Sequence, residues 1–178
     1  MGVYVYVDKN FEMGNMIKEY KTKDELAELV PVIAEIWREH YTSLIGAEQV
    51  EYMLEKFQSV DAVSRQIAEE NYRYFGIFCD GELAGYYAVQ PSGGDRVFLS
   101  KFYVVADFRA RGLGKQMLEH LIANAQAAGA KTVWLTVNKH NRSVDIYHKL
   151  GFAITEEIVT DIGNGFVMDD YKMEKTIG

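Results

Sequence analysis

One glycine-rich, basic segment of the sequence is suited to binding an anion. Gly112 and Gly114 lie where a predicted strand gives way to a predicted helix, so backbone N–H groups stay unpaired at the helix N-terminus. The helix dipole adds roughly half a positive charge at that end. Arg109, Arg111 and Lys115 add side-chain charge in a chain whose net charge is −7. The pattern therefore predicts a site for a phosphate-bearing ligand.

Two common nucleotide-binding motifs do not fit this segment. A phosphate-binding loop would need glycine at the position of Arg109 and serine or threonine at that of Gln116. A dinucleotide fingerprint would need its third glycine at Met117. The absence of serine or threonine after Lys115 and of an evident carboxylate for magnesium argues against a nucleotide-dependent phosphotransferase. A glycine-rich turn with solvated basic residues is the simplest alternative reading.

A second motif follows about thirty residues later, from Asn141 through Tyr147 to Gly151-Phe152. Together with Arg109-x-x-Gly112-x-Gly114, it resembles the paired signatures of the GNAT superfamily of N-acetyltransferases. The strand 99–105, which precedes the first motif, also reads like the central strand of that family. The resemblance is sharp over residues 97–152 and extends in element order over residues 16–173.

The resemblance implies that the chain binds acetyl-CoA. The pyrophosphate would lie on the backbone amides of residues 109–115, and the pantetheine arm would pair with the central strand. Asn141 would contact the same arm, besides capping its own helix. The cofactor-binding residues expected from the resemblance are Tyr103, Val104, Val105, Arg109, Ala110, Arg111, Gly112, Leu113, Gly114, Lys115, Asn138, Asn141 and Tyr147.

Catalysis would need a general acid, an oxyanion donor and a base. Tyr147 matches the position of the acid in the family, although a buried tyrosine in a helix is by default a core residue. The backbone N–H near Val104 is the expected oxyanion donor. Many relatives carry glutamate where this chain has Ser100, which is a poor base, so the base stays unassigned. Lys101 is expected on the opposite side of the sheet from Ser100.

The acyl acceptor is expected to be the primary amine of a small molecule, attacked directly in a ternary complex. Its site would lie between the loop and helix around Tyr41, Glu48 and Tyr52 and the C-terminal hairpin with Asp169 and Asp170. An acidic, tyrosine-lined groove suits a cationic amine, and the layout resembles bacterial diamine and polyamine acetyltransferases. Protein lysine, an amino sugar, an amino acid and an antibiotic amine stay open.

The elements that position these residues alternate between helices and strands. Helices are expected over 22–40, 47–57, 61–71, 112–128 and 141–150, with a loop over 41–46. Strands are expected over 16–20, 72–79, 83–90, 97–105, 131–137, 153–160 and 166–173. This order predicts a single α/β (α+β) domain. The resemblance implies a mostly antiparallel sheet of about seven strands, helices on both faces and a splayed central strand pair.

Composition limits the remaining possibilities. The chain of 178 residues suits one domain over 16–178, preceded by an extension, residues 1–15, with a strand candidate at 3–7. No apolar run is long enough to cross a bilayer, and the negative charge disfavours nucleic acid and anionic membranes. One cysteine, Cys79, fits a reducing cytoplasm, and no metal-site spacing occurs. A homodimer through the 3–7 strand is one option.

Two functional hypotheses follow from these observations. The first is an acyl-CoA-dependent N-acetyltransferase that uses Tyr147, with Ser100 at the position of the usual base. The second is a non-catalytic module that senses acetyl-CoA or docks a partner, which the absence of glutamate at Ser100 favours and Tyr147 disfavours. The two hypotheses differ in whether substitution of Tyr147 removes a turnover.

Overall fold

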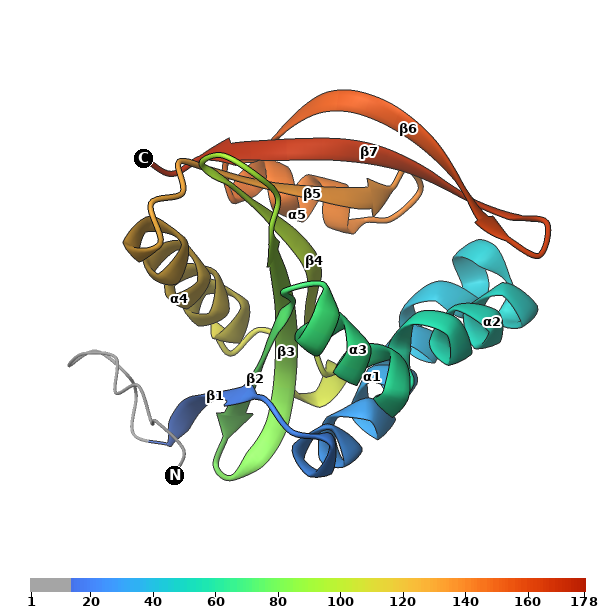
Figure 1. Ribbon diagram of the computed structural model, residues 1–178, viewed down its shortest axis with the longest axis horizontal. Helices are drawn as coiled ribbons and strands as arrows, with labels where there is room; N and C mark the ends of the chain where they lie inside the picture. Colours follow the sequence, from blue (N-terminus) through green and yellow to red (C-terminus); the bar gives the residue numbers. More distant parts are fainter. Residues whose placement is uncertain (1–13) are drawn as a thin grey trace.

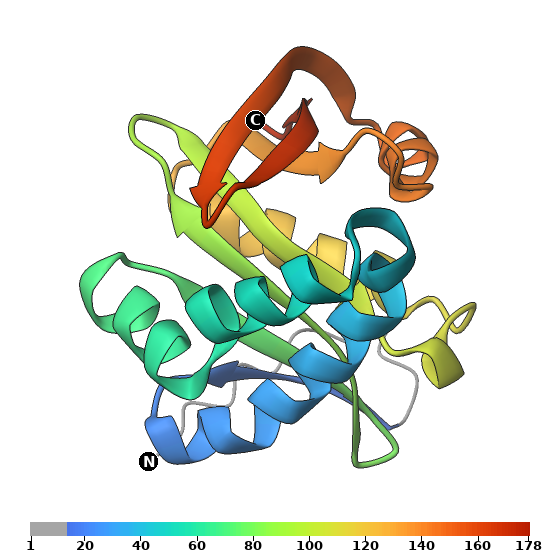
Figure 2. The ribbon, with the colours of Figure 1, turned by 90° about the vertical axis from the view of Figure 1, so that its right-hand side faces the viewer.

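The computed structural model describes residues 14–178 and consists of one twisted sheet with helices on both faces (Figures 1 and 2). The predicted strand 3–7 and most of the predicted extension lie outside these residues. The elements are β1 (Asn15–Tyr20), α1 (Lys23–Ile45), α2 (Ala47–Gln58), α3 (Val60–Glu69), β2 (Arg73–Cys79), β3 (Glu82–Pro91), β4 (Arg96–Val104), the short helix Ala106–Phe108, α4 (Leu113–Ala127), β5 (Thr132–Asn138), α5 (Ser143–Lys149), β6 (Ala153–Gly163) and β7 (Phe166–Thr176).

The seven strands lie in the order β1-β2-β3-β4-β5-β7-β6. Every neighbouring pair is antiparallel except β4 and β5, which are parallel because α4 carries the chain back across the sheet. The predicted α/β class, the mostly antiparallel sheet and the central position of β4 are confirmed. Among the described helices, none is long and apolar enough to cross a membrane.

Each face of the sheet has its own apolar core. On one face α4 and α5 cover a core that includes Leu99, Met117 and Phe152. On the other face α1, α2 and α3 cover a second core that includes Trp37 and Tyr86. In Figure 1, α4 lies on one side of the central strands and α1–α3 lie on the other. The strand β4 contributes side chains to both cores, whereas the buried apolar side chains of β5 belong to the first core alone.

Helix α1 corrects the predicted loop over 41–46. The predicted start is confirmed, since Thr22 and Glu25 form a capping box, but the helix continues to Ile45. Tyr41 and Ile45 pack against the same core as Trp37, so apolar burial extends the helix by more than a turn. Pro31 is exposed and lies within the continuous helix. Tyr41 thus sits on a rigid helix rather than a loop.

Candidate active site

A wedge opens between β4 and β5. The two strands pair only at Arg96–Thr132, Val97–Val133 and Phe98–Trp134, after which they diverge, which confirms the expected splayed pair. Beyond this point the edge of β4 that faces β5 carries backbone groups with no strand partner among residues 14–178. Such an edge can pair with an extended, amide-bearing ligand arm.

The backbone of Val104 points into this wedge. The N–H of Val105 donates to the Ala84 carbonyl of β3 at 2.8 Å, so the N–H of the preceding residue faces the opposite way. The Val104 carbonyl also faces the wedge, where Arg109 Nε donates to it at 3.3 Å. The expected oxyanion donor at Val104 therefore has the required direction.

A β-bulge in β4 brings Ser100 and Lys101 to one face of the sheet. Ala88 pairs with Lys101 and Val89 pairs with Leu99, which leaves Ser100 as the extra residue. The prediction that Lys101 lies opposite Ser100 is wrong, because strict alternation fails at a bulge. Lys101 Nζ donates to Ser100 Oγ at 2.5 Å, and both residues line the same cavity.

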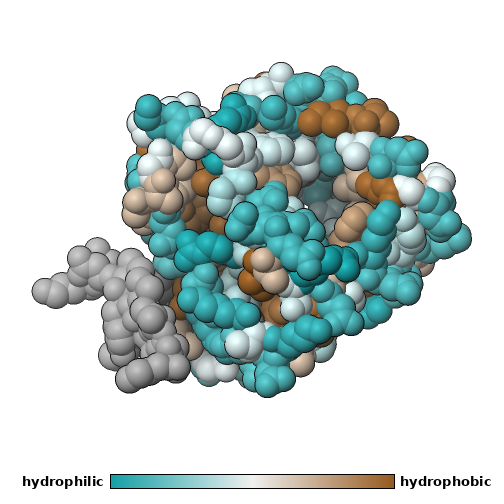
Figure 3. Space-filling model, viewed as in Figure 1, coloured by the Kyte–Doolittle hydropathy of each residue, from teal (hydrophilic) through white to brown (hydrophobic). Residues whose placement is uncertain are grey.

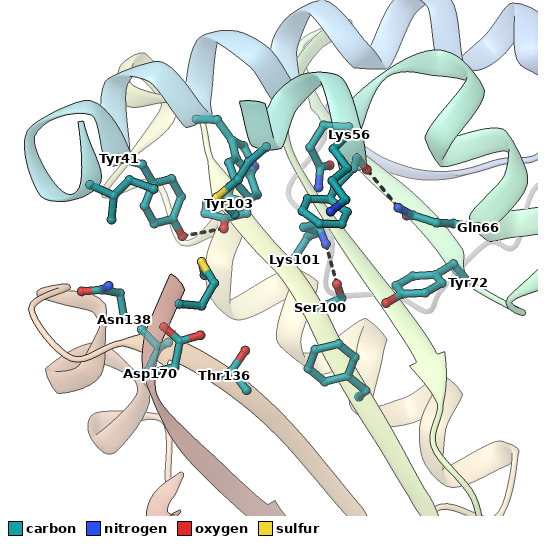
Figure 4. A pocket seen from close by; sticks show the side chains of 18 of the residues that line it. Tyr41, Lys56, Gln66, Tyr72, Ser100, Lys101, Tyr103, Thr136, Asn138 and Asp170 are labelled. Carbon is teal, nitrogen blue, oxygen red and sulfur yellow. Dashed lines mark hydrogen bonds between the residues drawn. The ribbon is translucent and has the colours of Figure 1, made fainter. Parts of the chain in front are cut away.

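That cavity has a volume of about 440 Å³ and lies between α1–α3 and the strands β4, β5 and β7 (Figure 4). The space-filling view shows the corresponding hollow on one face of the molecule (Figure 3). Its polar lining side chains are Tyr41, Lys56, Gln58, Arg65, Gln66, Glu70, Tyr72, Ser100, Lys101, Tyr103, Thr136, Asn138 and Asp170. Apolar side chains such as Trp37 and Phe98 complete the wall.

Asp170 is a buried carboxylate in the wall of this cavity. It is 5% exposed and pairs in the sheet with Asn138, beside the opening of the wedge. Its Oδ1 has no hydrogen-bond partner among the described residues. Burial, together with the charge of Asp169, raises the pKa of Asp170 to about 6. A carboxylate in this state is ionised at neutral pH and is a stronger base than an exposed aspartate.

Tyr41 and Tyr103 are half-buried tyrosines near this carboxylate. Their oxygens lie 2.7 Å apart, and their rings pack with Trp37, whose Nε1 donates to Tyr86. Burial raises the pKa of Tyr41 to about 12, with a contribution from Asp170. Both tyrosines are therefore neutral. Because one hydroxyl donates to the other, the pair can donate one hydrogen bond into the cavity.

Tyr147 approaches the wedge from the other face of the sheet. Its ring lies 6.5 Å from that of Phe102 on β4 and 5.6 Å from that of Phe152. Burial raises its pKa above the usual range, and Tyr41 adds a smaller contribution. No hydrogen bond found within residues 14–178 uses its hydroxyl. The side chain holds its proton at neutral pH, as a general acid requires.

The predicted anion site has the expected backbone geometry. Ala110 and Gly112 adopt left-handed conformations, with φ of 62° and 75°. None of the amides from Ala110 to Lys115 donates to a backbone carbonyl within the described chain. Leu113 begins α4, so the free amides converge at the positive end of that helix. The loop thus has the geometry of an anion-binding cradle.

The basic side chains of this loop are partly engaged elsewhere. Arg109 forms an ion pair with Glu39 of α1 at 3.0 Å and contacts His40. Arg111 donates to the Asp107 carbonyl at 3.2 Å, whereas Lys115 lies exposed near Glu119. The side chain of Arg109 therefore joins α1 to the loop, and its own N–H donates to the Ala106 carbonyl at 3.2 Å, so the free amides begin at Ala110.

The cradle predicts a specific effect of a single methyl group. Alanine at Gly112 would be strained at a φ of 75°, by about 1–2 kcal/mol, and relief of that strain would shift the amides. We expect Gly112→Ala to weaken coenzyme A binding about tenfold, measured by calorimetry. Gly165→Ala is the matched control, since its φ is 77° with equally open space at a distant turn. Equal affinity of both variants for coenzyme A would contradict the cradle.

Asn138 and Asn141 order the turn that leads into α5. Asn138 Oδ1 accepts from the His140 N–H at 3.0 Å, and Asn141 Oδ1 accepts from the Ser143 N–H at 2.8 Å. The predicted N-cap role of Asn141 is wrong, because α5 begins at Ser143 with Arg142 as its N-cap; Asn141 instead orders the turn just before the helix. Asn138 also lines the cavity, next to Asp170 in Figure 4.

The five residues expected to bind the acceptor separate into two groups. Tyr41 and Asp170 line the cavity. Glu48 is exposed on α2, outside the lining, and Asp169 forms an ion pair with Lys139 at 2.7 Å. Tyr52 donates to the Ile162 carbonyl at 3.0 Å, in the tip of the β6–β7 hairpin.

Contacts between α2 and the β6–β7 hairpin close one end of the cavity. Besides Tyr52, Lys56 Nζ donates to the Ile162 carbonyl at 2.6 Å, and Gln49 donates to the Val167 carbonyl at 3.1 Å. Figure 1 shows the hairpin tip reaching over to α2. One end of the cavity is therefore bridged by side chains of α2.

Comparison with known proteins places the fold and the motifs in one family. A family model for an acetyltransferase (GNAT) domain matches residues 41–175, well over half of the chain. The ribosomal protein bS18-alanine N-acetyltransferase of Salmonella typhimurium is 31% identical over 112 residues, which are 62% of this chain and 75% of that protein. The spermine/spermidine N(1)-acetyltransferase of Bacillus subtilis is 28% identical over 96 residues, covering 49% of this chain and 63% of that protein.

Solved structures show the same architecture. An N-acetyltransferase (PaiA) of Thermoplasma acidophilum, crystallised with coenzyme A, superposes with a TM-score of 0.75 at 22% identity. The match covers 90% of this chain and 98% of that one. An acetyltransferase of Streptococcus pneumoniae is 27% identical, with a TM-score of 0.64, over 92% of this chain and 99% of the other.

Proposed function

The chain belongs to the GNAT family of acetyltransferases, and on this premise we propose that it transfers the acetyl group of acetyl-CoA to the primary amine of a small molecule bound in the cavity. One observation carries the proposal. The buried, partly unpartnered carboxylate of Asp170 lies in a closed-ended cavity next to the wedge between β4 and β5.

The residues on both sides of the wedge fit acetyl-CoA. The free amides of residues 110–115 would hold its pyrophosphate, and the unpaired edge of β4 near Val104 would hold its amide-bearing arm. When bound, acetyl-CoA supplies an acetyl group activated as a thioester. Family members are acyl-CoA-dependent N-acyltransferases, so this assignment follows from the family as well as from the geometry.

Asp170 would accept the proton of the acceptor amine. An aliphatic amine has a pKa near 10.4, so only about one molecule in 2,500 is neutral at pH 7. Attack needs the lone pair, and an adjacent carboxylate both attracts the ammonium and removes its proton. We assign the base to Asp170 rather than Ser100, since a serine hydroxyl is not basic and Ser100 already accepts from Lys101.

Tyr147 would supply a proton to the departing thiolate. Its raised pKa keeps the hydroxyl protonated until the sulfur needs the proton. The Val104 N–H, which points into the wedge, would donate to the oxygen that gains charge during attack. The acceptor ammonium loses two protons overall, of which one goes through Tyr147 to the leaving group and the other reaches solvent through Asp170.

The bridged cavity favours a small-molecule acceptor over a protein terminus. The match to a spermine/spermidine acetyltransferase supports polyamines as one acceptor class, as the sequence also predicted. The cavity is not the acidic groove expected for a polyamine, because Glu48 and Asp169 lie outside the lining, and the carboxylates of Glu70 and Asp170 share it with Lys56, Arg65 and Lys101. A cytoplasmic location and a homodimer stay predictions.

Release of free thiol from acetyl-CoA tests the proposed function. The panel would contain diamines, spermidine, spermine, amino acids, amino sugars and lysine peptides, with an amine-free control. We expect amine-dependent thiol release and an acetylated amine in the mass spectrum. Tight acetyl-CoA binding with no release for any amine would contradict the enzyme and favour the sensor hypothesis.

A further inference from the structure

The cavity carries opposite charges at two separated places. Asp170 lies on the β7 wall, and Lys101 lies across the open space on β4 (Figure 4). We propose that the acceptor of this enzyme is a zwitterionic amine, with its ammonium at Asp170 and a carboxylate held by Lys101. This inference rests on the proposed acetyl transfer and narrows its substrate to amino-acid-like amines.

Lys101 is a cation without a counterion. The bulge turns its side chain into the cavity, where Nζ donates to Ser100 Oγ, a neutral acceptor, and lies 5.9 Å from the Tyr72 ring centroid. No carboxylate within residues 14–178 forms an ion pair with it. Burial lowers the pKa of Lys101 to about 8, so most molecules keep the charge at neutral pH. A ligand carboxylate would supply the missing partner.

Gln58 provides a second unpartnered polar group in the same cavity. Its side chain is 2% exposed, and neither the amide nitrogen nor the amide oxygen has a hydrogen-bond partner among the described residues. Gln58 is the last residue of α2 and lines the cavity together with Lys101. Buried amides are normally satisfied, so a polar ligand group is the partner expected here.

The other charged groups of the lining support the same polarity. Lys56 and Arg65 add positive charge on α2 and α3, and Glu70 adds one negative charge at the end of α3; all three residues are exposed, and together they leave one positive charge. Asp170 is thus the only buried carboxylate in the described lining. A polyamine would bring a second ammonium toward Lys101, whereas a carboxylate at that place is attracted. The charge pattern therefore favours the zwitterion over the polyamine.

Matched amines that differ only by a carboxylate test the inference. Ornithine and 1,4-diaminobutane form one pair, and lysine and 1,5-diaminopentane form the other. We expect kcat/KM to be at least about tenfold higher for the amino acid of each pair, because a charge-assisted bond to a half-buried lysine would be gained. Lys101→Met should bring this ratio to about one. Lys131→Met, an exposed lysine near Asp95, should leave it unchanged.

Two results would overturn the inference: equal or higher kcat/KM for the diamines, or a ratio that persists in Lys101→Met. A binding measurement separates this inference from the proposed function. Calorimetry with coenzyme A present would compare N-acetylornithine with N-acetyl-1,4-diaminobutane. Preferential binding of N-acetylornithine that Lys101→Met abolishes, without turnover of any amine, would support the carboxylate site and contradict the acetyl transfer. Turnover of the diamines but not of the amino acids would support the acetyl transfer and contradict the carboxylate site.

Discussion

Replacing Asp170 with asparagine is expected to lower kcat by at least about 100-fold while acetyl-CoA affinity stays unchanged. Asparagine keeps the shape of the side chain and removes the only buried carboxylate in the described lining of the cavity. The phosphate cradle lies at the N-terminus of α4, away from this wall, so cofactor binding should not respond. Steady-state rates with saturating amine, together with calorimetry of coenzyme A, measure the two quantities.

The pH dependence of kcat/KM gives the same assignment independently. A base must be ionised to act, and kcat/KM reports the free enzyme, so kcat/KM of the natural protein should rise with pH through the pKa of Asp170, about 6. Below that value each pH unit should cost about a factor of ten. This decrease in kcat/KM at acidic pH should vanish in Asp170→Asn. It should persist in Asp95→Asn, where an exposed carboxylate near Lys131 is removed. A decrease that survives in Asp170→Asn would assign the base elsewhere.

The same substitution should not destabilise the fold. The pKa of Asp170 is raised in the folded state from 3.8 to about 6, so stability is lost as the pH rises through this interval. Above pH 6 the ionised carboxylate lowers the free energy of unfolding by up to about 3 kcal/mol. An asparagine, which carries no charge, would not lower it in this way. We expect Asp170→Asn to unfold at equal or higher urea concentration than the natural protein at pH 8. Earlier unfolding would mean that lost activity reflects lost structure.

Replacing Tyr147 with phenylalanine is expected to lower kcat about 100-fold, with little change in acetyl-CoA affinity. The ring would keep its packing against Phe102 and Phe152, and only the proton donor for the thiolate would be lost. Stopped-flow detection of thiol release, with calorimetry of coenzyme A, would separate chemistry from binding.

Tyr20→Phe is the matched control for this tyrosine. The Tyr20 hydroxyl is also buried and has no partner among the described residues, but it lies in β1, far along the sheet from the wedge. Its removal should leave kcat unchanged and the fold at least as stable. A comparable loss of kcat in both variants, or a Tyr147→Phe enzyme with full activity, would remove Tyr147 from the mechanism.

Local patterns were sufficient to predict most of the fold. The capping box at Thr22 and Glu25, the hairpin turn at Asp80-Gly81 and the glycine before α4 each act within a few residues. The end of α1 was mispredicted because burial of Tyr41 against the second core extends the helix, and that contact depends on residues distant in sequence.

The anion cradle was predictable for the same reason, whereas the acceptor site was not. A bulge at Ser100 depends on the pairing register between β3 and β4, so no reading of alternation could place Lys101 in the cavity. Gln58 likewise could not be identified from the sequence. It matters because its side-chain amide has no hydrogen-bond partner among the described residues, which only the folded structure shows. Asp170 was singled out, but its burial, and hence its basicity, appears only in the folded chain.

A single-turnover experiment tests the central claim most directly. The protein, loaded with isotope-labelled acetyl-CoA, would be mixed with excess ornithine and the reaction quenched at short times. The masses of the protein and of the amine would then be measured by mass spectrometry. Direct attack predicts that the label passes to the amine at the rate of kcat or faster while the protein stays unlabelled. Label on the protein before it reaches the amine, at Lys101 or elsewhere, or label that stays on acetyl-CoA, would contradict the account.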